Sequence, residues 1–207
     1  SAVERNDVVI DTQPGVSGNQ PETTRYYYDL AGNLDRADLA NEAITDYRYD
    51  SLNRLSSLTH YAPDATPANL ENNPKLAEFQ YTVRAEGKRT AAIETFWLDS
   101  DGNGTAEAHP STYAWVYDDL GRLTSEAIDH SDGQFDLTES FVYDLASNRT
   151  RRELDTDGDS LADEVFASEF DANDRLIREL IDDDGTAGVD RTVTHAYDHT
   201  QGTGKTV

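Results

Sequence analysis

The sequence lacks cysteine, methionine and long apolar runs. Without cysteine, neither a disulfide framework nor thiolate chemistry is available to the protein. No hydrophobic stretch approaches the ~20 residues that a membrane-spanning helix needs, so we expect no membrane insertion. No signal-peptide pattern is present, and the chain starts at Ser1 rather than at a methionine. We therefore expect a processed or excised segment, and a secreted form would already have lost its leader.

Basic residues are scarce. The 207 residues include 41 acidic against 17 basic side chains, which gives a formal net charge of −24. A protein this acidic repels phosphate backbones and anionic membranes, so we expect no nucleic-acid partner and regard cations as the natural one. A hydrophobic content of 36 % is enough for a thin core. The eleven tyrosines recur in register, which indicates an ordered chain.

A cassette of 26 or 27 residues recurs in the second half of the chain. Three copies that each begin with Tyr-Asp or Phe-Asp follow one another directly, at residues 117–143, 143–170 and 170–197. Such a fixed spacing is typical of a repeat array. Within a cassette, segments such as 122–128 and 137–143 alternate apolar and polar residues with period two, and turn residues separate them. We predict an all-β fold, a meander of β-hairpins that forms an extended or curled antiparallel sheet.

Earlier cassettes extend the array towards the N-terminus, where an arm precedes it. Residues 1–25 form this arm, and its apolar run, Val8-Val9-Ile10, predicts one strand. The array then occupies residues 26–207, with a loop insertion rich in proline and asparagine at about 62–75. The arm strand has two interpretations: it is an edge strand of this domain, or it is donated to the sheet edge of a neighbouring subunit.

Four cassette starts share a longer pattern. They are Tyr28-Asp29-Leu30-Ala31-Gly32-Asn33, Tyr49-Asp50 with Asn53-Arg54-Leu55, Tyr117-Asp118 with Gly121-Arg122-Leu123-Thr124, and Tyr143-Asp144 with Asn148-Arg149-Thr150. With these residues the chain resembles the YD-repeat (RHS-repeat) family over residues 26–200. The resemblance implies a large secreted or surface β-structure, such as a spiralling shell that encloses toxin cargo or the extracellular part of an adhesion protein. Two features depart from it: the chain is far shorter than shell-forming members, and its distal turns are expanded into acidic loops.

Three acidic loops have oxygen-bearing side chains at positions 1, 3, 5 and 9 around a tight glycine turn. Positions 1, 3, 5, 7 and 9 are Asp99, Asp101, Asn103, Thr105 and Glu107 in the first loop, Asp155, Asp157, Asp159, Leu161 and Asp163 in the second, and Asp182, Asp184, Thr186, Gly188 and Asp190 in the third. Alternating oxygen ligands, with a backbone carbonyl from position 7, are the arrangement that wraps calcium. We predict calcium as the cofactor, with an affinity of ~0.1–1 mM as in extracellular modules.

The calcium hypothesis has a simpler alternative, in which each Asp-Gly pair only forms a good hairpin turn. That alternative gives no reason for carboxylates at positions 1 and 9. The loops are not EF-hands, because strands flank them and position 12 is Pro110 in the first loop and Phe166 in the second. A fourth loop, at residues 129–136, is one residue shorter and out of phase, so it matches the pattern less well.

No constellation typical of catalysis stands out, so we expect no enzyme. His195 and His199 would lie about 13 Å apart on a strand, too far for one zinc ion. The GTGKT segment at residues 202–206 lacks the spacing and the following helix of a P-loop. The recurrent tyrosines predict a stacked ladder of rings in the core; they are Tyr28, Tyr49, Tyr117, Tyr143 and Tyr197.

These observations predict a non-enzymatic, extracellular structural repeat protein whose acidic turns are stabilised by calcium. Head-to-tail self-assembly through residues 1–15 and the C-terminal sheet edge would extend it into a filament or surface layer. One alternative is a fragment of a secreted toxin-encapsulating or adhesive YD-repeat shell protein. Another is a carbohydrate-binding module that takes a glycan on exposed tyrosine and tryptophan side chains such as Trp97 and Trp115.

Overall fold

The computed structural model describes residues 6–13, 22–63, 70, 73–131, 133, 136–186 and 188–197. They belong to two compact units, Ser1–Thr112 and Tyr113–Val207, which we describe separately. No α-helix occurs among the described residues. Consequently, this part of the chain offers no helix with the length and apolarity needed to cross a membrane.

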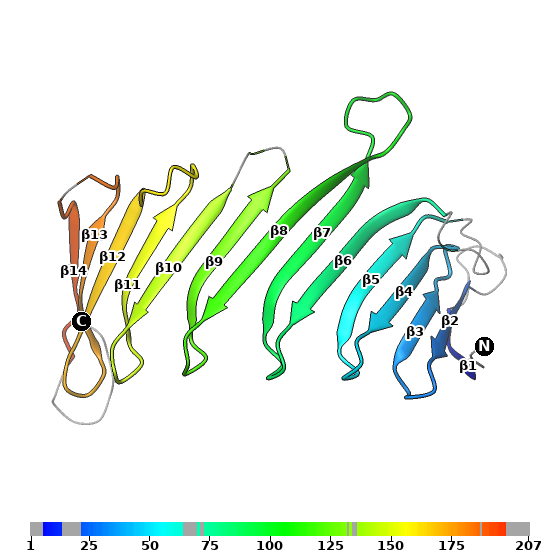
Figure 1. The fold of residues 1–207 in the computed structure, drawn as a ribbon, viewed down its shortest axis with the longest axis horizontal. Coiled ribbons are helices and arrows are strands. Elements are labelled where there is room, and N and C mark those ends of the chain that lie inside the picture. Colours follow the sequence, from blue (N-terminus) through cyan, green and yellow to red (C-terminus); the bar gives the residue numbers. More distant parts are fainter. Residues whose placement is uncertain are drawn as a thin grey trace. The chain divides into compact units, whose positions relative to one another are not determined.

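The first unit is a β-meander in which each strand pairs with the next strand in the sequence. Its strands are β1 (Asn6–Gln13), β2 (Glu22–Tyr28), β3 (Leu34–Asp38), β4 (Ile44–Tyr49), β5 (Leu55–Tyr61), β6 (Lys75–Val83) and β7 (Arg89–Leu98). Strands β1 to β7 form one antiparallel ladder in sequence order (Figure 1). The next strand, β8 (Glu107–Tyr117), begins in this unit and ends in the second.

The second unit repeats the same arrangement. Its strands are β9 (Leu123–His130), β10 (Leu137–Tyr143), β11 (Arg149–Asp155), β12 (Glu164–Phe170), β13 (Leu176–Asp182) and β14 (Arg191–Thr194). They too pair antiparallel in sequence order. The prediction of an all-β hairpin meander is therefore confirmed.

Residues 6–13 of the N-terminal arm form strand β1. It pairs antiparallel with β2 of the same chain, with a register shift between Val9 and Asp11. This is the edge-strand interpretation of the arm. Self-assembly through residues 1–15 stays a prediction, because residues 1–5 and 14–21 lie outside the described part. Most of the predicted insertion at 62–75 and the segment 198–207, with His199 and GTGKT, lie outside it as well.

Both units have a thin core, because one layer of strands leaves neither face fully covered by a second layer. The buried apolar side chains of the described residues are few, and half of them are alanines: Ala37, Ala43, Ile44, Tyr61, Ala77, Ala92, Phe141 and Ile181. In the first unit, Phe79 makes edge-to-face contacts with His60 and Phe96, with ring centroids 6.1 and 5.8 Å apart. Cross-strand contacts of this kind replace a deep core.

Large apolar residues are instead exposed at the tips of the Tyr-Asp turns. Leu30, Leu52, Leu120 and Leu145 all project into solvent there. These leucines add little hydrophobic stabilisation, so another interaction must hold the turns. That interaction comes from the aspartate of each Tyr-Asp or Phe-Asp pair.

The aspartate closes each turn with its carboxylate. Asp118 Oδ1 accepts the N–H groups of Leu120 (3.0 Å) and Arg122 (2.8 Å), and Oδ2 accepts Arg122 Nε at 2.6 Å. Its backbone N–H also donates to the Arg122 carbonyl at 3.0 Å. The aspartates that bond in the same way to the residue four positions later are Asp29, Asp50, Asp144 and Asp171.

The third residue after each of these aspartates has a positive φ. The five residues are Gly32 (88°), Asn53 (63°), Gly121 (78°), Ser147 (73°) and Asp174 (59°). A three-residue hairpin loop places its last residue in this left-handed region, next to a β-bulge. The register shifts in β2, β4, β10 and β12 fall at the expected place, where each strand meets its turn. Glycine at positions 32 and 121 therefore has a conformational cause.

Several of these turns are also tied to the next turn by the fourth residue after the aspartate. Arg122 donates to the Asp144 carbonyl at 3.0 Å and to Ser147 Oγ at 3.2 Å. Asn148 Nδ2 donates to Asp174 Oδ1 at 3.0 Å. In the first unit, Asn33, four residues after Asp29, exchanges side-chain hydrogen bonds with Asn53 of the next turn, and the distance from Asn53 Nδ2 to Asn33 Oδ1 is 3.0 Å. Side chains of one Tyr-Asp turn thus form hydrogen bonds with the next Tyr-Asp turn of the same unit.

The cassette tyrosines complete the same connection. Tyr143 donates its hydroxyl to the Leu123 carbonyl at 2.8 Å, and the Arg122 guanidinium lies 4.7 Å from the centroid of the Tyr143 ring. Tyr197 repeats both contacts with Leu176 (2.8 Å) and Arg175 (4.8 Å). Tyr143 and Tyr197 therefore bind to the first residue of an earlier strand and to the arginine before it, which gives a reason for tyrosine and arginine to recur together. The predicted ladder of stacked rings did not include these hydroxyl and cation-π contacts.

We expect Asp118→Ala to lower the melting temperature by about 2–6 °C, because it removes three hydrogen bonds from the turn. Asp118→Asn retains an acceptor for the backbone N–H groups and should lose less. Thermal unfolding followed by circular dichroism measures both. Asp119→Ala is the matched control, since the Asp119 side chain is next in sequence and is exposed. An equal loss in the control would contradict a specific role for Asp118.

The turn aspartates also predict a pH dependence. Hydrogen bonds from the residue four positions later hold the pKa of Asp29, Asp50, Asp118 and Asp144 below the ordinary value of an aspartate. Hydrogen bonds from Arg175 lower the pKa of Asp171 to about 2. A pKa lowered by folding stabilises the folded state above the unfolded pKa, and that stabilisation is lost as the pH falls through the folded pKa. The difference in melting temperature between wild type and Asp171→Asn should therefore shrink between pH 5 and pH 2. A difference that stays constant over this range would contradict the assignment.

Candidate metal-binding loops

The three acidic loops lie at the strand ends opposite the Tyr-Asp turns. They connect β7 to β8, β11 to β12 and β13 to β14 (Figure 1). Each brings three carboxylates together, with one oxygen from each residue within 4.8 Å of the others. The groups are Asp99, Asp101 and Glu107; Asp155, Asp157 and Asp159; and Asp182, Asp184 and Asp190. The sequence pattern thus identified residues that do converge.

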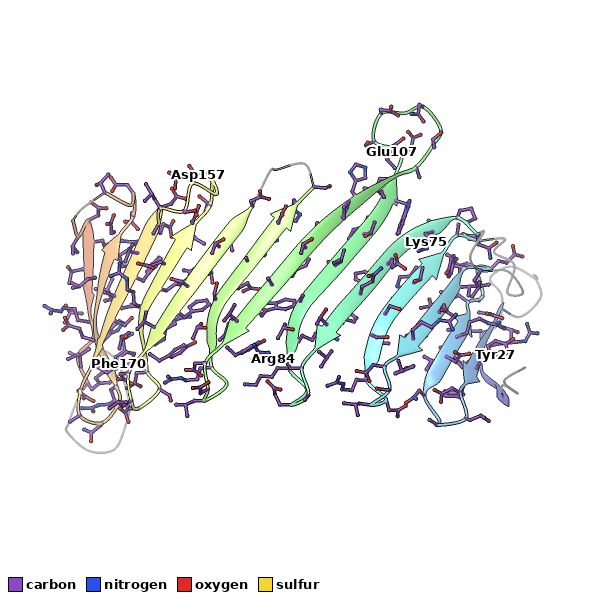
Figure 2. The ribbon with its side chains drawn as sticks, viewed as in Figure 1. Tyr27, Lys75, Arg84, Glu107, Asp157 and Phe170 are labelled. Carbon is purple, nitrogen blue, oxygen red and sulfur yellow. The ribbon has the colours of Figure 1, made fainter. Side chains whose placement is uncertain are left out.

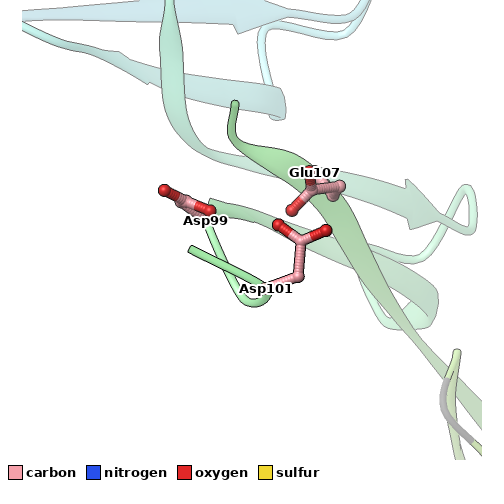
Figure 3. Close-up of side chains that lie close together, drawn as sticks. All are labelled: Asp99, Asp101 and Glu107. Carbon is pink, nitrogen blue, oxygen red and sulfur yellow. The ribbon is translucent and has the colours of Figure 1, made fainter. Parts of the chain in front are cut away.

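The first loop is organised by hydrogen bonds from its own backbone. Asp99 Oδ2 accepts the Gly104 N–H at 2.9 Å, and Asp101 Oδ1 accepts the Asn103 N–H at 3.0 Å. The Asn103 side chain accepts the Thr105 N–H at 2.7 Å. Figure 3 shows the carboxylates of Asp99, Asp101 and Glu107 turned towards a common space. Positions 1, 3 and 9 of the predicted pattern therefore meet in this loop.

The second loop gathers positions 1, 3 and 5 instead. Asp155 accepts the N–H groups of Gly158 (2.7 Å) and Ser160 (3.0 Å), and Asp159 accepts the N–H of Leu161 (2.7 Å). Position 9, Asp163, bonds to Thr156 through the backbone and the hydroxyl, both at 2.6 Å. These bonds, the hydroxyl foremost, lower the pKa of Asp163. In this arrangement Asp163 closes the loop base and is not grouped with the other three.

The third loop again gathers positions 1, 3 and 9. Asp184 Oδ1 accepts the Thr186 hydroxyl at 2.7 Å and its N–H at 3.0 Å, and these bonds lower the pKa of Asp184. Asp190 Oδ2 accepts the Asp183 N–H at 2.9 Å. Gly188, at position 7, is exposed. Thr186 and Asp184 thus fix the turn, as Asn103 and Asp101 do in the first loop.

The second and third loops touch through a glycine. A Cβ atom added to Gly185 would lie 2.1 Å from the backbone oxygen of Ala162. Gly185 also has a positive φ of 66°. Only glycine satisfies both conditions, so the two loops are packed together at this point. The sequence alone gave no reason to expect this contact, because it depends on the spacing of the two hairpins.

These loops can offer several oxygen atoms to a hard cation, and carboxylates held this close repel each other without one. The hydrogen bonds within the loops are equally those of well-formed Asx turns. The ligand roles of Asn103, Thr105, Leu161, Thr186 and Gly188 therefore stay predictions. In the fourth loop, Asp136 accepts the His130 N–H at 2.9 Å, while residues 132, 134 and 135 lie outside the described part.

The two tryptophans and His195 have different surroundings. Trp115 donates its indole N–H to Glu126 Oε1 at 2.8 Å and stacks on Tyr113, with ring centroids 6.0 Å apart. His195 Nε2 lies 3.4 Å from Glu179 Oε2. Trp97 instead lines a cleft beside the first acidic loop. Of the two tryptophans considered for sugar binding, only Trp97 has a ring that lines this cleft.

Comparison with known proteins finds one informative relative in sequence. No family model matches the chain. The chain is 30% identical over 161 residues to the toxin protein Tse5 of Pseudomonas aeruginosa. The aligned region covers 70% of this chain and 12% of Tse5. The chain is therefore similar to a bacterial toxin protein. It spans only this small part of Tse5, and the similarity supports a YD-repeat-like (RHS-like) relationship.

Solved structures with partial likeness are toxin complexes. A crystal structure of TcdB2-TccC3-TEV has a TM-score of 0.34 and 13% identity, over 89% of this chain and 11% of that chain. The Photorhabdus luminescens Tc holotoxin pore has a TM-score of 0.31 and 12% identity, over 86% of this chain and 12% of that chain. TM-scores this low do not establish a shared fold.

Proposed function

We propose that the chain is a non-catalytic scaffold segment of a larger, secreted YD-repeat protein of the toxin-associated kind. The observation that carries this proposal is the hydrogen-bonded link from one Tyr-Asp turn to the next, seen from Arg122 to Asp144 and from Asn148 to Asp174. The similarity to the toxin protein Tse5 supports it. This was the alternative in the sequence analysis, and it now takes precedence over an independent filament or surface layer.

A scaffold role follows from how the repeats are stabilised. Each hairpin bonds mainly to its neighbours, so the array gains order by adding units and needs no central core. Side chains such as Arg122 and Tyr143 connect one hairpin to the next at their Tyr-Asp ends. An array of this kind makes a wall whose stiffness depends on its turns. Enclosing another polypeptide is the use of such a wall that the YD-repeat resemblance implies.

The scaffold proposal predicts the size and behaviour of the natural product. An antibody against this segment should detect, in the culture medium of the producing bacterium, a polypeptide much longer than 207 residues. Limited proteolysis should leave a linked polypeptide protected. The double variant Asp118→Ala with Asp144→Ala should expose that polypeptide, whereas Asp119→Ala should not. A native product of this chain's own length would contradict the proposal, as would a linked polypeptide that is cleaved equally in all three proteins.

Within this scaffold, we propose that the acidic loops hold calcium. The support is the convergence of three carboxylates within 4.8 Å in each of three loops. Oxygen ligands suit calcium, and loops that lack the bidentate glutamate of an EF-hand should bind it at ~0.1–1 mM. Calcium would also neutralise part of the net charge of −24, which otherwise opposes the folded state.

About 10 mM calcium should raise the melting temperature by about 3–10 °C over a chelator-treated sample, since a ligand that binds only the folded chain stabilises it. The triple variant Asp101→Asn, Asp157→Asn and Asp184→Asn removes position 3 from every loop and should abolish most of this shift. Asparagine keeps an acceptor for the turn N–H groups, so the fold is preserved.

Two controls separate specific binding from general screening of a highly charged chain. Sodium chloride at matched ionic strength should produce a smaller shift than calcium. Asp119→Asn removes a charge outside the loops and should retain the calcium shift. If the triple variant responds to calcium as strongly as wild type does, the acidic loops are plain turns.

A further inference from the structure

A cleft of about 570 Å³ lies where the first acidic loop passes the start of β6. It is lined by Asn73, Pro74, Lys75, Trp97, Gly104, Thr105 and Ala106. Figure 2 labels Lys75 and Glu107, which mark the start of β6 and the loop end of β8. The volume is within the range of small-molecule sites. Trp97 is the single aromatic side chain among these residues, so its indole is the main apolar surface available to a ligand.

Hydrogen bonds and charge hold the walls of this cleft in place. Lys75 Nζ lies 5.2 Å from the centroid of the Trp97 ring and pairs with Glu78 at 3.0 Å. On the opposite wall, the Gly104 N–H donates to Asp99 and the Thr105 N–H donates to Asn103. These contacts order parts of both walls, which lowers the entropy cost of binding a ligand there.

We propose that this cleft binds a neutral pyranose unit of a glycan. The C–H face of a sugar ring packs on a flat aromatic ring such as Trp97, and sugar hydroxyls pair with polar groups of the kind that Asn73, Lys75 and Thr105 supply. This site goes beyond the scaffold role and does not depend on it.

The charge and shape of the cleft select against other ligand classes. An anionic ligand would be repelled by the Asp99, Asp101 and Glu107 carboxylates in the same loop and by the net charge of −24. An organic cation would have to displace the Lys75 ammonium, which already lies 5.2 Å from the centroid of the Trp97 ring. A purely apolar ligand would find one aromatic ring in an otherwise largely polar or small-residue lining. A neutral, hydroxyl-rich ring fits all of these conditions.

A glycan array tests the proposal with the wild-type chain and Trp97→Ala. We expect retention of wild type on neutral glycans and at least a tenfold weaker signal for Trp97→Ala. Thr105→Val, which keeps the shape of the side chain and removes its hydroxyl, should weaken binding about threefold to tenfold. Circular dichroism and melting temperature must show that both variants are folded as wild type is.

Fluorescence provides a second measurement on the same residue. The chain has two tryptophans, so Trp115→Phe leaves Trp97 as the only indole, and Trp115 lies outside the cleft. A saccharide found on the array should change the Trp97 emission in a saturable way. The proposal is overturned if no neutral glycan retains wild type, if Trp97→Ala binds equally well, or if the glycans retained are predominantly acidic.

Discussion

The carboxylate that closes each Tyr-Asp turn is the interaction on which the rest of this structure depends. A single layer of strands buries few large side chains, and half of the buried apolar residues described here are alanines. Hydrophobic burial alone therefore specifies the strand register weakly, and a slip of one residue would exchange the two faces of a strand. Asp118 and its equivalents remove that freedom, since their hydrogen bonds fix the turn and the adjacent bulge.

The same aspartates explain how an acidic chain forms an ordered array. In several turns the carboxylate is paired with an arginine four residues later, as Asp50 is with Arg54 and Asp171 with Arg175. The guanidinium of Arg122 extends onwards to the next turn and lies against Tyr143. Charge neutralisation, turn closure and contact between repeats are thus performed by one small set of side chains. The opposite strand ends differ, because carboxylates gather there in groups of three.

The loop at residues 99–107 connects the two proposed binding activities. Its carboxylates converge where calcium is proposed to bind, while Gly104 and Thr105 form a wall of the cleft beside Trp97. Hydrogen bonds from Gly104 to Asp99 and from Thr105 to Asn103 join these two surfaces. A cation in the loop would therefore stiffen one wall of the glycan cleft, and the scaffold would supply the rigid strands beneath both. The contact of Gly185 with Ala162 similarly joins the second and third loops.

The repeat spacing, the period-two alternation and the turn residues determined the all-β meander from the sequence alone, because these signals are local. The three acidic groups were also predictable, since alternate residues of a short loop converge wherever the chain turns tightly. The sequence did not reveal which carboxylates would meet: Asp163 binds Thr156 rather than the group formed by Asp155, Asp157 and Asp159.

Other features were decided by tertiary structure because they join residues from separate hairpins or strands. The tyrosines act through their hydroxyls and through arginine, as the Tyr143 contacts with Leu123 and Arg122 show. Trp97 and Trp115 look equivalent in sequence, yet the Trp115 indole N–H is hydrogen-bonded to Glu126, whereas Trp97 lines a cleft. Sequence periodicity determines where a strand and its turns lie, whereas the partner of each side chain depends on the distances that strand pairing sets between segments far apart in the chain.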